Sequence, residues 1–119
     1  MSKRVLVVDD SNLMRHRISQ CLEDAGHKVV GKAKNGEEAI ELYQQVHPDV
    51  VTMDITMRGK DGITAAQEIL ASDPDASIVF YTLLDTPTNL SARLEKVTVK
   101  KLIRKGDEED LLRTLASMA

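Results

Sequence analysis

The chain lacks the cysteine pairs and the long apolar runs that are typical of secreted and membrane proteins. Its single cysteine, Cys21, excludes an internal disulfide and is compatible with a reducing compartment. Lys3 and Arg4 precede only four consecutive apolar residues, too few for a signal-peptide core or a membrane span. A net charge of −3 gives no general attraction to nucleic acid or anionic lipid. We therefore expect a cytoplasmic protein with no membrane insertion and no direct nucleic-acid binding.

The sequence also lacks the ligand spacing of a transition-metal site. The three histidines (His16, His27 and His47) stand far apart, as surface or boundary residues would. Cys21 falls among apolar residues at helical spacing, which favours a buried core thiol over a nucleophile. At 119 residues the chain has the length of one domain of ordinary size, and we expect residues 1–119 to form it.

Short apolar runs alternate with segments of helical periodicity along the whole chain. We expect strands at Val5–Val8, Val29–Ala33, Val50–Met53, Ser77–Tyr81 and Val99–Ile103. We expect helices to begin near Ser11, Glu37, Gly62, Thr86 and Asp107, with Asn35–Gly36 as a loop before the second. This alternation predicts an α/β fold with a parallel sheet, right-handed crossovers and helices on both faces. Lys100 and Lys101 interrupt the last strand, which indicates an edge position.

Reactive side chains follow four of the expected strands. Asp9 and Asp10 come directly after the first strand and Asp54 after the third. Thr82 follows the fourth strand and Lys105 the fifth. Taken singly, each has an ordinary explanation as a helix cap or a strand end. Parallel strands share one carboxyl edge, where open α/β folds bind ligands, so the joint arrangement predicts a common site.

The chemistry of such a site follows from its charges. Three carboxylates in a small space raise one another's pKa unless a cation compensates them, and Mg²⁺ prefers oxygen ligands. The metal and Lys105 would neutralise charge on a transferring phosphoryl group. Asp54 would then be the nucleophile that forms an acyl phosphate, and Thr82 would donate a hydrogen bond to the product.

Together these residues resemble a response-regulator receiver domain of the CheY-like, single-domain chemotaxis type, over essentially the full chain. The resemblance is carried by the Thr82 and Lys105 positions and by Val5–Ser11, Asn35–Ala39, Pro48–Met57 and Asp61–Gly62. It implies a flavodoxin-like, doubly wound, five-stranded parallel sheet of order 2-1-3-4-5 with five helices.

The resemblance also implies a role for each residue of the site. Asp54 would be the phosphoacceptor and a metal ligand. Asp10 would bind Mg²⁺ directly, Asp9 would act through water, and the backbone carbonyl of Thr56 would complete the protein ligands. The phosphoryl donor would be a histidine of a sensor histidine kinase or phosphotransfer protein, and the output a downstream target protein. Such a domain assists its own phosphorylation without being a turnover enzyme on a separate substrate.

Several positions depart from the family pattern, and two of them bear on the switch. Gly106 follows Lys105 where the family usually has proline, and a non-proline cis bond costs about 3–4 kcal/mol. We therefore expect a trans peptide there. Leu102 stands where the family has an aromatic switch residue, so rotation of a ring cannot be the readout of phosphorylation. We expect the change to be confined mainly to residues 82–90 and the helix that follows.

Three other functions are compatible with parts of this pattern. A flavodoxin-like cofactor binder shares the strand order, but Asp9 and Asp10 would repel its phosphate. A phosphohydrolase of the haloacid dehalogenase type would need a second aspartate where Thr56 stands. A degenerate receiver could act as a phosphorylation-independent protein-binding module, although the complete set of reactive residues favours phosphorylation.

Overall fold

The computed structural model describes residues 2–83, 97 and 101–118, which form one parallel sheet covered by helices. Its strands are β1 (Arg4–Val8), β2 (Lys28–Ala33), β3 (Val50–Met53), β4 (Ile78–Thr82) and β5 (Lys101–Arg104). The helices in the described ranges are α1 (Asn12–Asp24), α2 (Gly36–Val46), α3 (Gly62–Ser72) and α5 (Glu108–Ser117). The sheet order β2-β1-β3-β4-β5 confirms the predicted topology. The helix expected near Thr86 lies outside the described residues.

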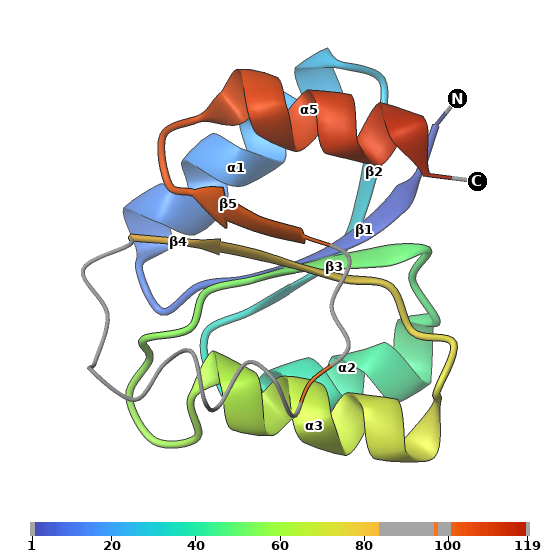
Figure 1. The fold of residues 1–119 in the computed structure, drawn as a ribbon. Coiled ribbons are helices and arrows are strands. Elements are labelled where there is room, and N and C mark those ends of the chain that lie inside the picture. Colours follow the sequence, from blue (N-terminus) through green and yellow to red (C-terminus); the bar gives the residue numbers. More distant parts are fainter. Residues whose placement is uncertain (1, 84–96, 98–100, 119) are drawn as a thin grey trace.

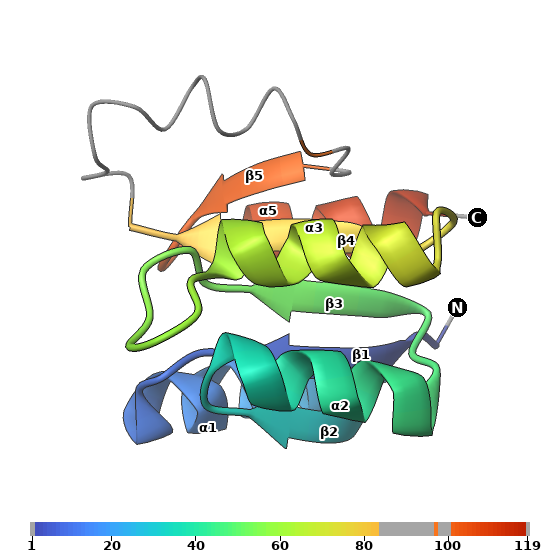
Figure 2. The same ribbon diagram turned by 90° about the horizontal axis from the view of Figure 1, so that it is seen from below.

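Helices cover both faces of the sheet (Figures 1 and 2). α1 and α5 lie on one face, and α2 and α3 lie on the other. Side chains of β1 alternate between the two layers, with Val5 and Val7 in one core cluster and Leu6 and Val8 in the other. Because a strand covered on both faces has no solvent side, β1, β3 and β4 are almost continuously buried. β5 lies at the edge and exposes Lys101, as its lysines predicted.

Several helix ends lie where local residues of the sequence predicted them. Ser11 caps α1 and Asp107 caps α5, each side chain accepting a backbone N–H from the first turn. Gly26 lies just past α1 with φ +91°, a left-handed conformation that favours glycine. α2 ends at Val46, and its C-cap His47 is left-handed at φ 45°, one residue before the predicted breaker Pro48.

One core prediction was wrong. Cys21, within α1, is half-buried rather than in the core. Burial raises the pKa of its thiol to about 11, with Glu108 adding to the effect, so the sulfur is protonated at neutral pH.

In the described part of the chain, no helix is long and apolar enough to cross a membrane.

Candidate functional site

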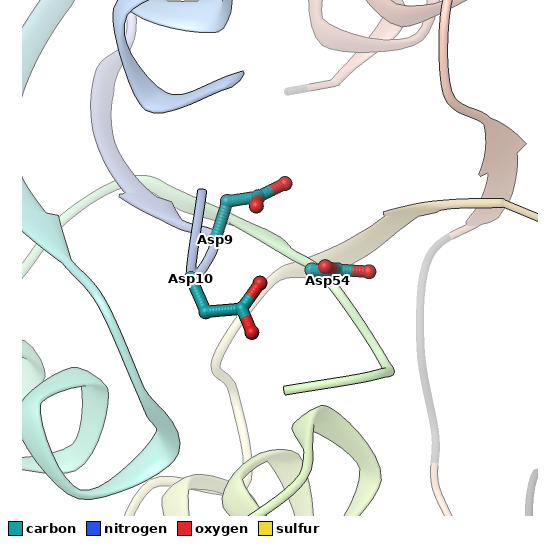
Figure 3. A group of neighbouring side chains, drawn as sticks. All are labelled: Asp9, Asp10 and Asp54. Carbon is teal, nitrogen blue, oxygen red and sulfur yellow. The ribbon is translucent and has the colours of Figure 1, made fainter. Parts of the chain in front are cut away.

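Three aspartates lie together at the carboxyl edge of the sheet (Figure 3). Val8 of β1 pairs with Met53 of β3, so the next residues along, Asp9 and Asp54, emerge side by side. Asp10 follows directly, and one carboxylate oxygen from each of the three acids lies within 4.8 Å of those of the other two. Asp9 is fully buried and Asp54 is 4% exposed, whereas Asp10 is exposed. The strand register thus places two buried acids and one open acid in a single cluster.

A hydroxyl and an ammonium group reach the same cluster from the other half of the sheet. The Thr82 hydroxyl donates a hydrogen bond of 2.9 Å to Asp54 Oδ1. The Lys105 ammonium donates one of 3.1 Å to Asp54 Oδ2 and lies 2.8 Å from Asp9 Oδ2. Both oxygens of Asp54 therefore have a donor. The structure brings together all five side chains that the sequence assigned to one site.

Burial and charge set opposing effects on the ionisable groups. Burial raises the pKa of Asp54, and the neighbouring Asp9 carboxylate adds to this, while Lys105 and Thr82 oppose it. Burial alone would lower the pKa of Lys105. Its contact with Asp9 and the charge of Asp54 outweigh that effect and raise the pKa above its ordinary value. Lys105 is therefore a cation at neutral pH, held between two carboxylates.

The buried Asp9 carboxylate is held from its own segment of chain. The backbone N–H of Ser11 donates to Asp9 Oδ1 at 2.9 Å, and the Arg15 guanidinium bonds to the Asp9 backbone carbonyl. Asp9 Oδ2 is ion-paired with Lys105 but accepts no well-aligned hydrogen bond from the residues described. A buried oxygen with unused acceptor capacity, beside two further carboxylates, fits a hydrated hard cation such as Mg²⁺.

Gly62 allows α3 to begin directly against the phosphoacceptor candidate. A Cβ at this position would lie 2.0 Å from the Asp54 carbonyl oxygen and 2.9 Å from the Met53 side chain. The Gly62 N–H donates to the carbonyl of Ile55 at 2.9 Å, which ties the helix start to the chain after β3. A side chain here would displace the backbone of Asp54, so the start of α3 requires a glycine beside the site.

Sequence reasoning missed Tyr81, which lies beside the site, and the structure does not test the role predicted for Thr56. The Tyr81 hydroxyl accepts a hydrogen bond of 2.9 Å from the N–H of Gly106, the residue after Lys105. No spacing in the sequence signals this contact, because it joins a strand to a distant turn. The Lys105–Gly106 peptide is trans, as expected. Thr56 lies exposed in the bend after Asp54, and the metal-binding role of its carbonyl stays a prediction.

The comparisons with known proteins agree with this geometry. The family model described as the response regulator receiver domain matches residues 5–116. The chain therefore belongs to the response regulator receiver family, the receiver component of two-component signalling.

Individual relatives support the same assignment. The protein CcdB of Bacillus subtilis is 37% identical over 113 residues, which cover 95% of this chain and 94% of CcdB. The chemotaxis protein CheY of Thermotoga maritima is 49% identical over 79 residues, 66% of each chain. Among solved structures, the CheX–CheY–BeF3–Mg²⁺ complex of Borrelia burgdorferi aligns with a TM-score of 0.85 and 32% identity. That alignment covers 96% of this chain and 87% of the other.

Proposed function

We propose that residues 1–119 form a single receiver domain that accepts a phosphoryl group on Asp54 and thereby switches its binding to a downstream protein. The observation that carries the proposal is the environment of the Asp54 carboxylate. It is 4% exposed, each of its oxygens meets a donor, and two further carboxylates lie within 4.8 Å. A structural aspartate at a strand end needs no second and third acid beside it, whereas a metal-assisted phosphoacceptor does.

The reaction requires positioning and charge neutralisation more than covalent assistance. A carboxylate oxygen of Asp54 forms a bond to phosphorus as the phosphorus–nitrogen bond of a phosphohistidine breaks, leaving that electron pair on the imidazole nitrogen. Lys105, already within 3.1 Å of Asp54, neutralises negative charge on the phosphoryl oxygens. The Thr82 hydroxyl, now donating to Asp54 Oδ1, donates to a phosphoryl oxygen in the product.

The acidic cluster fits Mg²⁺. Asp10 and Asp54 would bind it directly with the backbone carbonyl of Thr56, and Asp9 would act through a bound water. The buried Asp9 oxygen without an aligned hydrogen bond supports this assignment. When bound, Mg²⁺ would supply positive charge to the phosphoryl oxygens. The similar Borrelia structure was solved as a complex that includes both Mg²⁺ and beryllium fluoride.

The phosphoryl donor and the downstream target lie outside this domain. The proposed donor is the phosphohistidine of a histidine kinase or phosphotransfer protein, which the chain's membership of the receiver family supports. The downstream partner reads the altered surface, and the domain turns over no separate substrate.

A mass shift tests the proposal directly. Incubation with acetyl phosphate should add one phosphoryl group only when Mg²⁺ is present, and Asp54→Asn should abolish the addition. Asp10→Asn should remove the Mg²⁺-dependent addition while the protein stays folded, because Asp10 is exposed at the rim of the cluster. Asp49→Asn is the matched control: this acid directly precedes the same strand at its other end and accepts the Arg4 N–H, and its variant should be phosphorylated normally.

The result also separates the competing functions. A protein with no mass shift but tight binding to a partner would instead be a phosphorylation-independent binding module. Unchanged phosphorylation of Asp10→Asn would contradict the metal assignment alone. Addition to a residue other than Asp54 would overturn the proposed phosphoacceptor.

A further inference from the structure

One hydrogen bond near the site has no part in the function proposed above. The Tyr81 hydroxyl, on a side chain that is 2% exposed, accepts the N–H of Gly106 at 2.9 Å. Tyr81 is the penultimate residue of β4 and lies in the core layer shared by α1 and α5. Gly106 belongs to the turn that leads from β5 into α5. The bond therefore ties an exposed turn to a buried ring.

The turn held in this way carries Lys105. The backbone N–H of Lys105 donates to the Thr82 carbonyl at 2.8 Å. The next backbone N–H, that of Gly106, donates to the Tyr81 hydroxyl. The backbone on both sides of the Lys105 Cα is thus anchored to consecutive residues of β4. From this doubly anchored position the side chain reaches both Asp9 and Asp54. A cavity of about 300 Å³ lies beside the turn, so a turn released from Tyr81 has space to move.

The residue at position 106 fits this anchoring role. Gly106 has φ +97°, outside the range of ordinary side-chain-bearing residues and far from the φ near −65° that proline requires. Proline also has no N–H to donate. A glycine here adopts the left-handed conformation and supplies the donor that the Tyr81 hydroxyl accepts.

We propose that Tyr81 is a positioning residue for Lys105, acting through the Gly106 N–H. The inference rests on the proposed function and deepens it: the hydroxyl of Tyr81 holds the turn so that the ammonium stays directed at the phosphoryl site. Tyr81 touches neither Asp54 nor the phosphoryl group in this role.

The anchor itself is tested without phosphorylation. In Tyr81→Phe the ring remains and only the hydroxyl is lost, so the core stays filled. Amide hydrogen exchange at Gly106, measured on the complete unphosphorylated chain, should become faster by about three- to tenfold, the range expected for loss of one ordinary hydrogen bond. Unchanged exchange at Gly106 would overturn the inference.

The positioning role is tested by a double-mutant cycle. With acetyl phosphate and saturating Mg²⁺, Tyr81→Phe should slow phosphorylation of Asp54 by about three- to tenfold. In a Lys105→Met background the same change should alter the rate by no more than about twofold, because no ammonium remains to be positioned. A merely structural role would slow both backgrounds equally, and that result would overturn the inference.

Two matched controls separate positioning from stability. Tyr43→Phe removes another buried tyrosine hydroxyl, bonded to Asp73 at 2.7 Å between α2 and α3, and should leave the rate unchanged. Gly106→Ala and Gly26→Ala each place a side chain at φ above +90° with nothing within 4 Å of the new Cβ. Both should lower stability similarly, and only Gly106→Ala should slow phosphorylation.

The wild-type rate separates a failure of the proposed function from a failure of the role proposed for Tyr81. If the wild type is not phosphorylated at all, the proposed function fails and this inference fails with it. If the wild type is phosphorylated and Tyr81→Phe reacts at the same rate, the inference fails alone.

Discussion

The Thr82 hydroxyl donates a 2.9 Å hydrogen bond to Asp54 Oδ1 while Lys105 occupies Oδ2. The phosphoacceptor candidate is therefore already surrounded by the two side chains expected to hold its product. In the usual account of the family, the threonine moves toward the phosphoryl group. Here its hydroxyl needs only to exchange one oxygen acceptor for another at the same site.

We first predict the effect of removing that hydroxyl. Thr82 is 1% exposed, so Thr82→Val leaves a buried carboxylate oxygen without its donor and should cost about 1–3 kcal/mol of unfolding free energy at neutral pH. Thr82→Ser retains the donor and should cost less. Urea unfolding of the metal-free proteins measures both. Thr82→Val keeps the methyl group and Thr82→Ser keeps the hydroxyl, so equal losses for the two variants would contradict a dominant contribution of the hydrogen bond.

The pH dependence of the Thr82→Val deficit follows from Asp54. Burial raises the pKa of Asp54 above its ordinary 3.8, so between 3.8 and the folded-state value the folded protein binds more protons than the unfolded chain. Stability therefore falls as pH rises through that interval. Because the Thr82 hydrogen bond lowers this pKa, its loss should widen the interval and make the deficit larger at neutral pH than in acid. A deficit independent of pH would contradict this.

The second prediction concerns the ammonium between the two buried carboxylates. The Lys105 side chain is 12% exposed, and Lys105→Met leaves Asp9 and Asp54 facing each other uncompensated. We expect the metal-free protein to lose about 3 kcal/mol of unfolding free energy. Adding Mg²⁺ should narrow the gap to wild type, because a bound cation replaces part of the lost charge. Adding Asp54→Asn to Lys105→Met should recover stability; failure to do so would show that repulsion is not the cause.

The third prediction uses the close approach of α3 to Asp54. Gly62→Ala would place a Cβ 2.0 Å from the Asp54 carbonyl oxygen, so the helix start or the Asp54 backbone must shift. We expect a loss of about 1–3 kcal/mol of unfolding free energy together with slower phosphorylation. Gly31→Ala is the control, since its Cβ would meet the flexible end of Leu6 at 3.0 Å, away from the site. It should cost stability without changing phosphorylation, as unfolding and mass-shift measurements on both variants can establish.

The fourth prediction concerns acid stability at the opposite end of the sheet. Nδ1 of His27 accepts the Lys3 N–H at 3.0 Å, and burial lowers the pKa of His27 below its ordinary 6.5. Between the folded-state pKa and 6.5 the unfolded chain binds the extra proton, so stability should be lost as pH falls through that interval. His27→Gln should reduce the loss, whereas His16→Gln, on an exposed position of α1, should not. Thermal unfolding between pH 7 and pH 5 compares the three proteins.

Much of the architecture can be predicted from local sequence patterns. The continuous apolar runs of β1, β3 and β4 identify strands buried on both faces, and the lysines near β5 identify an edge. Side-chain caps such as Ser11 and Asp107 act within one turn of their own position, so they too were predictable. Reactive residues at strand ends could be assigned to one site because parallel strands share an edge.

Packing between distant segments decided what the pattern left open. Register pairs Val8 with Met53 and so places Asp9 beside Asp54, but strand-end positions alone cannot show that Lys105 lies between those acids. Cys21 is half-buried, although its helical spacing predicted a core position, for a similar reason. Periodicity shows which face of a helix points inward, but it does not show how deeply neighbouring elements cover that face.

The sequence by itself determined the fold class, through its periodicity, and the membership of the acidic site, through the residues at the ends of strands. The strand order came from the resemblance to the receiver family. Only the tertiary structure decided which donors meet each oxygen of Asp54, how closely α3 approaches it through Gly62, and that Tyr81 holds the turn after Lys105. Those contacts join residues far apart in the chain. Their distances depend on how the helices and turns pack against the sheet, which no local spacing encodes.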